Sequence, residues 1–253
     1  MNFTTKPKNK YRQMRKSVKP GEVLLIPMDN RLLEDVRPYK AGGKNLPTWF
    51  KAAPKDGIRR CAGVLEYLNI GFIIPAWTDF SFIPRPELGG WDVSIGQMPF
   101  SLVPFESQPF PASTTGECPM SRVRGIESSP YPKLVNPYSI VTAKGWSSII
   151  TGIPYEPNNN YDVVPALVHT DYYHQMNVVL NLKGTEPFVI RYGEPLVQIF
   201  PFFRSGDTES IKFGSEDDFK YVYGRGVSDG PTRLQGEGIG LGYRKNRKTT
   251  DAE

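Results

Sequence analysis

Short apolar stretches separated by turn residues dominate the chain between residues 137 and 203, and this pattern predicts strands. Within Met176–Leu182 the apolar residues alternate with Asn177 and Asn181, so we expect the apolar residues on a buried face and the asparagines on the opposite one. The predicted strands are Tyr138–Thr142, Trp146–Thr151, Val163–His169, Met176–Leu182, Pro187–Tyr192 and Leu196–Phe203. Together they predict a meander-like core of short antiparallel strands.

The first half of the chain adds fewer strands. Glu22–Pro27 has the composition of a short buried strand, and Ile70–Ile83 that of a bent strand or strand pair broken at Pro75. Residues 84–132 are so rich in proline that few of them suit a central strand. We expect an irregular excursion there with short strands at Trp91–Ile95 and Phe100–Val103, and an inserted domain is the alternative.

Helices are expected at only two places. Ile58–Asn69 carries apolar residues at intervals of three to four, with Gly71 as a plausible stop, and Ser215–Tyr223 begins with a capping serine followed by acidic residues. Trp49 and Phe50 are expected to anchor their segment on the core, because aromatic side chains bury large areas. The fold class predicted is therefore mainly β, with one or two short helices.

Charge divides the chain of 253 residues into three parts. Residues 1–20 hold seven Lys and Arg and no acid, which leaves 24 basic against 26 acidic residues in the remainder. We expect residues 1–20 to be a basic arm that is disordered alone. It could attach to nucleic acid, an acidic partner or a neighbouring subunit, and a solvated tail is the alternative. Residues 21–223 are expected to be a single mainly-β domain, and residues 224–253 a Gly-rich, charged tail.

Several classes of protein are disfavoured by what the sequence lacks. No stretch approaches the ~20 apolar residues of a membrane span, and the N-terminus has no signal-peptide core, so we expect no membrane association and a cytoplasmic location. Cys61 and Cys118 match neither a disulfide framework nor a zinc site. A metal site is conceivable with His169, Asp171 and His174 as ligands. Two histidines beside a strand are more often ordinary polar residues, so no metal is expected.

The region 137–203 resembles the dUTPase and dCTP deaminase superfamily. The likeness is carried by Ala166–Tyr172, Asn177–Leu180, Phe188–Ile190 and Gly193–Ile199, in order and at close spacing, with Lys144-Gly145-Trp146 at a family turn. It implies a β-clip fold and a homo-oligomer, with a trimer favoured. The same stretch also resembles an uncharacterised family of bacteria and tailed phages, through Thr170–Tyr172, Met176-Asn177 and Gly193–Pro201. This second resemblance extends further along the chain and implies no function.

Within this resemblance the active site is altered. In this resemblance His169 occupies the position of the family's water-orienting aspartate. Tyr172 occupies the position of the tyrosine that lies beneath the deoxyribose. A neutral histidine can still act as a general base. The family's Arg-Ser phosphate motif is missing, since Ile149–Ile153 contains no arginine, so the electrostatic support for phosphoryl chemistry is weakened. If the protein is active, His169, Asp171 and Tyr172 are the residues expected to carry catalysis.

A nucleotide would need further contacts. Tyr172 and Gln198 are the ligand-binding residues suggested by the resemblance. The C-terminal tail adds Arg233, Gly236, Gly238 and Gly240, because glycine backbones can approach phosphates closely. A tail that packs on a neighbouring subunit is the alternative for this segment.

Three functions are open. The first is a non-enzymatic, self-assembling β-protein built on a dUTPase-like fold. It would be a structural or interaction protein of phage origin, located in the host cytoplasm or the virion. The second is a nucleotide-binding module without catalysis, for regulation or sequestration. The third is a divergent nucleoside triphosphate pyrophosphatase or deaminase. No cofactor is expected, and Mg²⁺ is expected only if the protein binds a nucleotide. On balance the sequence favours a protein that is not an enzyme.

Overall fold

A computed structural model describes residues 16–28, 30–85, 90–96, 132–156, 158, 160–183, 185–205 and 211–218. The chain divides into two compact units. The larger unit comprises residues 1–39 and 71–204, and the smaller one residues 40–70 and 205–253. The domain boundaries expected from the sequence stay a prediction.

The largest sheet is built around β13 (Pro195–Phe203), the longest strand. β13 pairs antiparallel with β8 on one side and with β3 on the other, and its residues Leu196 to Phe200 are buried. The strand order is β10 (Ala166–Val168), β8 (Trp146–Thr151), β13, β3 (Phe72–Pro75) and β2 (Tyr39–Lys40). A strand paired on both sides and buried on both faces requires the nearly continuous apolar run that the sequence has here.

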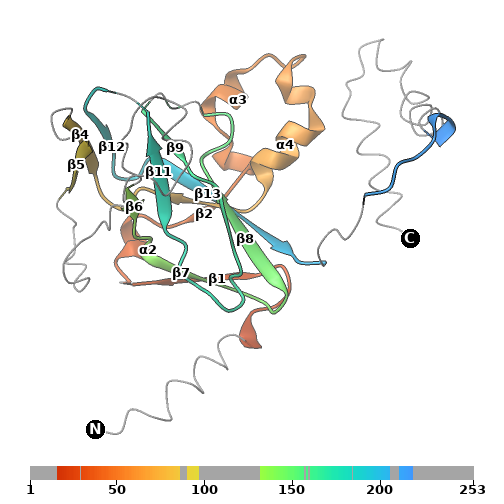
Figure 1. The fold of residues 1–253 in the computed structure, drawn as a ribbon, viewed down its shortest axis with the longest axis horizontal. Helices are drawn as coiled ribbons and strands as arrows, with labels where there is room; N and C mark the ends of the chain where they lie inside the picture. Colours follow the sequence, from red (N-terminus) through yellow and green to blue (C-terminus); the bar gives the residue numbers. More distant parts are fainter. Residues whose placement is uncertain are drawn as a thin grey trace, which may run out of the picture. The chain divides into compact units, whose positions relative to one another are not determined.

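Three smaller sheets complete the strand inventory of the described residues. They are β1 (Val23–Pro27) with β7 (Tyr138–Thr142); β6 (Lys133–Leu134), β11 (Val178–Leu182) and β9 (Tyr161–Val163); and β12 (Phe188–Ile190), β4 (Phe80–Arg85) and β5 (Gly90–Ile95). The mainly β fold class is confirmed. Most neighbouring strands are not consecutive in the chain, so the connectivity is not that of a meander; the β4–β5 hairpin, seen at one edge of Figure 1, is an exception.

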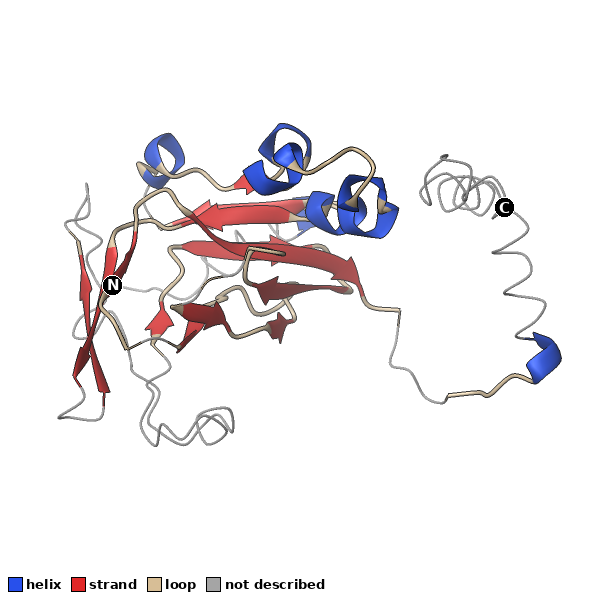
Figure 2. Ribbon diagram, turned by 90° about the horizontal axis from the view of Figure 1, so that it is seen from above, coloured by secondary structure: helices blue, strands red, loops and turns tan. Residues whose placement is uncertain are grey.

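The core of the larger unit fills the space between these sheets, whose layers are visible in Figure 2. Its fully buried side chains include Ile74, Phe82, Ile140, Leu180 and Leu196. The short helix α2 (Leu32–Asp35) contributes the buried Leu32, and the Tyr138 hydroxyl lies 3.0 Å from the Leu32 carbonyl and 2.9 Å from that of Val36. One phenol therefore ties α2 to β7.

The smaller unit contains four short helices between residues 43 and 69, and no described helix is long and apolar enough to cross a membrane. They are η1 (Gly43–Asn45), α3 (Thr48–Ala52), η2 (Ile58–Arg60) and α4 (Ala62–Asn69). Phe50 is buried, as expected for an anchor. The continuous helix predicted over residues 58–69 is wrong: Cys61 adopts an extended conformation and separates η2 from α4. Ser215 accepts a hydrogen bond from the Asp218 N–H, so the predicted helix cap is confirmed, while residues 219–223 lie outside the described part.

Several strand predictions need correction in detail. The predicted Val163–His169 strand is divided between β9 and β10, which lie in different sheets, because Pro165 stands between them and cannot donate to a ladder. Asn181 is buried rather than on a solvated face. Glu22–Pro27 is only half-buried as β1. β5 confirms the strand expected at 91–95, and Phe100–Val103 lies outside the described residues.

Candidate functional site

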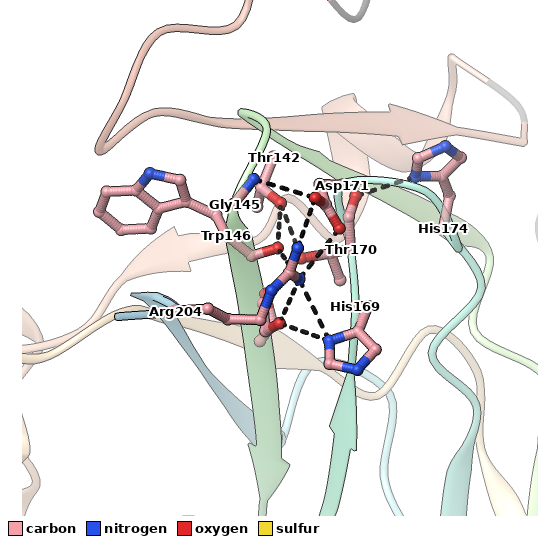
Figure 3. Close-up of polar contacts among 10 residues, drawn as sticks. Thr142, Gly145, Trp146, His169, Thr170, Asp171, His174 and Arg204 are labelled. Atoms are coloured by element: carbon pink, nitrogen blue, oxygen red, sulfur yellow. Dashed lines mark hydrogen bonds and ion pairs between the residues drawn. The ribbon is translucent and has the colours of Figure 1, made fainter. Parts of the chain in front are cut away.

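Three segments of the larger unit meet at Arg204, which follows β13. Gly145 comes from the turn between β7 and β8, and Asp171 from the turn after β10. Gly145 has φ +85, a conformation that favours glycine, and its carbonyl accepts a hydrogen bond of 2.8 Å from the Arg204 N–H. We call Gly145, Ser147, His169, Asp171 and Arg204 the Arg204 cluster (Figure 3).

A bidentate ion pair joins Arg204 to Asp171. Arg204 Nη1 lies 3.0 Å from Oδ1 of Asp171 and Nη2 lies 2.7 Å from Oδ2, while the Gly145 N–H donates to Oδ2 at 2.9 Å. Asp171 is only 3% exposed. The carboxylate is therefore enclosed, and both of its oxygens have hydrogen-bond partners.

These contacts determine the charge state of Asp171. Burial pushes the pKa of the carboxyl upward, but the hydrogen bonds from Arg204 and Gly145 and the positive charge of Arg204 outweigh burial, so the pKa is lowered. The carboxyl group remains ionised well below neutral pH. A buried carboxylate with a lowered pKa is a poor proton acceptor, because its charged form is already stabilised.

His169 lies on the other side of the guanidinium. Its Nδ1 is 3.1 Å from Arg204 Nη1 and 2.8 Å from Ser147 Oγ. Because arginine can only donate, this geometry assigns the lone pair to Nδ1 and the ring proton to Nε2. The nitrogen that could accept a proton is thus already engaged within the cluster.

Hydroxyl groups and a second histidine support the turn that holds Asp171. Thr170 Oγ1 lies 2.9 Å from Thr142 Oγ1 and 3.0 Å from Ser148 Oγ, and all three residues are buried. His174 Nδ1 lies 3.1 Å from the carbonyl oxygens of both Ile140 and Thr170, so it acts as a donor. His174 therefore fastens this turn to β7.

Comparison with known proteins adds little to this geometry. No family model matches the chain, and no curated protein matches it significantly. Among solved structures the chain is similar to the native dUTPase of EIAV, at 9% sequence identity and a TM-score of 0.33, over 58% of this chain and 87% of that one. A likeness of this size says nothing about activity.

The residues predicted for a site are not all brought together. His169 and Asp171 both contact Arg204, whereas Tyr172 is 61% exposed, with its ring centroid 5.4 Å from that of His169. Gln198 is buried in the middle of β13. The predicted tail residues Arg233, Gly236, Gly238 and Gly240 lie outside the described part of the chain.

Exposed aromatic side chains flank the Arg204 cluster in sequence. Tyr172 and Tyr173 follow Asp171, and Phe203, which is 60% exposed, precedes Arg204. The Phe203 ring packs edge-on against Trp146 with centroids 6.1 Å apart. Figure 3 shows the Trp146 indole directed away from the guanidinium, while its carbonyl accepts a hydrogen bond from Arg204 at 3.0 Å.

Sequence reasoning missed Arg204, Ser147 and the role of the Gly145 N–H. Arg204 ends the apolar run of β13, a position where a charged residue is common, so no local signal sets it apart. The described residues contain no group of three or more His, Cys, Asp or Glu side chains placed to share a metal ion.

Proposed function

We propose that this chain is a non-enzymatic β-protein that self-assembles and acts as a structural or interaction protein. The observation that carries the proposal is the enclosed Asp171 carboxylate. Its oxygens are occupied by Arg204 and Gly145, and the lone pair of His169 Nδ1 faces Arg204. His169, the candidate base, and Asp171, the other buried candidate for catalysis, are thus both engaged in contacts that join strand ends.

Self-assembly is supported by the surface beside the cluster. Tyr172, Tyr173 and Phe203 are exposed, and aromatic residues of this kind are enriched in protein interfaces. β10 is an edge strand whose Leu167 is also exposed, and an uncovered edge can pair with another chain. The sequence resemblance favours a trimer, and a location in the host cytoplasm or the virion belongs to the same proposal.

The catalytic alternative is tested by measuring pyrophosphate release and deamination with dUTP and dCTP in the presence of Mg²⁺. We expect no turnover at high protein concentration, because Asp171 and His169 cannot accept a proton without disrupting the cluster. Turnover that is lost in His169→Ala would overturn the non-enzymatic proposal.

Assembly is tested by light scattering on the full chain. We expect a mass that is a multiple of the 28.5 kDa of one chain, three times that value for a trimer. Two variants should lower the mass of the assembly. Leu167→Lys places a charge on the edge strand, and the double variant Tyr172→Ser/Tyr173→Ser removes aromatic contact area. Phe213→Ser is the matched control, because Phe213 is 93% exposed in the other unit. A monomer at every concentration would refute self-assembly.

A further inference from the structure

A cavity of about 640 Å³ lies in the larger unit, apart from the Arg204 cluster. It is bounded by the segment after β8, by β9, by Lys183 after β11 and by the start of β13. Ile153, Val163, Pro195 and Leu196 supply apolar wall. Its volume is within the roughly 300–1,000 Å³ typical of small-molecule sites.

The charges in the cavity are unbalanced. Glu156, Asp162 and Glu194 line it together with one cation, Lys183. Lys183 Nζ is 2.8 Å from Asp162 Oδ1, so its charge is matched by that carboxylate. Among the described residues no cationic side chain lies within ion-pair distance of Glu156 or Glu194. Two negative charges therefore remain in excess.

Tyr161 lines the cavity together with these two carboxylates. Burial, followed by the charges of Glu194 and Glu156, raises the pKa of the Tyr161 phenol to about 12, so the phenol stays protonated and uncharged. Its ring is stacked on Phe188 with centroids 5.9 Å apart, which fixes it in place. Partial burial of its carboxyl group also raises the pKa of Glu156. Glu156 and Glu194 line the same cavity as this fixed ring, so a single small ligand in the cavity could reach both carboxylates.

We propose that this cavity binds a small organic cation, with its ammonium or guanidinium group held by Glu156 and Glu194 and its carbon skeleton against Ile153, Val163 and Leu196. Such a ligand supplies the positive charge that the cavity lacks and covers its apolar wall. The same chemistry is available from a free diamine or guanidine and from the basic residues 1–20 of this chain. The site is independent of self-assembly.

The test is calorimetric titration of the full chain with cadaverine and with agmatine, using 1,5-pentanediol as an uncharged counterpart of cadaverine. We expect saturable binding of at least one of the two cations and none of the diol. Glu156→Gln and Glu194→Gln should each weaken binding by about tenfold, as expected for loss of a charge-assisted hydrogen bond. Glu186→Gln should leave binding unchanged, because Glu186 is exposed and does not line the cavity.

A synthetic peptide of residues 1–20 separates the two sources of the cation. If the peptide displaces the bound cation, the basic arm is the occupant; if it does not, a free cation is. Both glutamates are exposed, so the variants should fold, and a thermal melt of each checks this. Absence of binding by every probe, or equal binding by folded Glu156→Gln and Glu194→Gln, overturns the proposal.

Discussion

Arg204 and Asp171 form a bidentate ion pair that joins the end of β13 to the turn after β10, at 2.7 and 3.0 Å. Gly145 adds the β7–β8 turn, because its N–H donates to Asp171 and its carbonyl accepts from Arg204. Three chain segments that are distant in sequence are thereby fixed to one another. The ion pair is consequently expected to matter for stability more than a surface pair does.

Replacement of Asp171 by asparagine should lower the melting temperature by on the order of 5 °C or more, because it breaks an enclosed pair and removes an acceptor from Gly145. Asp162→Asn is the matched control: its pair with Lys183 is at the surface, with the Asp162 side chain 48% exposed, and such pairs contribute about 0–1 kcal/mol. Differential scanning calorimetry measures both. Equal melting temperatures for the two variants would contradict the importance assigned to the Arg204 cluster.

The contribution of Asp171 should depend on pH in acid. Its pKa is lower in the folded protein than the value of about 3.9 in an unfolded chain. The stabilisation is therefore fully present above about pH 4 and is lost as the pH falls through the folded-state pKa. Urea unfolding of the wild type and Asp171→Asn at a series of pH values should give a constant difference near neutrality that shrinks in acid. A difference that grows on acidification would show the opposite sign.

Gly71 and Gly193 provide a paired test of close backbone approach. Both have positive φ, +75 and +80, so alanine at either position should cost about 1–2 kcal/mol in conformational strain. At Gly71 the added methyl group would overlap the Ile199 carbonyl of β13. At Gly193 no atom lies within 4 Å of the added methyl group. Gly71→Ala should therefore cost roughly 1–3 kcal/mol more than Gly193→Ala in urea unfolding, since the β3–β13 pairing has to shift.

Tyr138→Phe should destabilise the larger unit by about 1–2 kcal/mol, because the carbonyls of Leu32 and Val36 lose the hydroxyl that they share. Tyr173→Phe serves as the control, as its side chain is exposed and its hydroxyl can be replaced by water. Both free energies of unfolding come from urea titrations. An equal effect of the two substitutions would mean that the α2–β7 contact contributes nothing.

The positions of the strands were largely predictable because their residues alternate or form short apolar runs. β7 and β8 coincide with their predicted ranges, and β13 differs by one residue. Predictions were less accurate where one residue decides between structures: Pro165 divides a predicted strand, and Cys61 interrupts a predicted helix. The strand order was not predictable, since nothing local indicates that Ile74 of β3 pairs with Val197 of β13.

The candidate site was predictable in part. His169 and Asp171 were singled out by their residue types and by resemblance, and they do lie together. Their partner Arg204 was not found, because its proximity to Asp171 arises only when β13 and β10 both flank β8. The identity of that partner shows that Asp171, a candidate for catalysis only if the protein is active, is held in an ion pair.

The pairing of β3 with β13 also has a consequence for biosynthesis. Among the described residues β13 is the last strand in the chain, and both β3 and β8 pair with it. The main sheet therefore cannot be completed until residue 204 has left the ribosome, and the edge of β3 that pairs with β13 has no partner until then. Contacts between such distant segments slow folding and prolong the exposure of apolar surface. We expect the nascent chain to depend on chaperones until its C-terminal strand emerges.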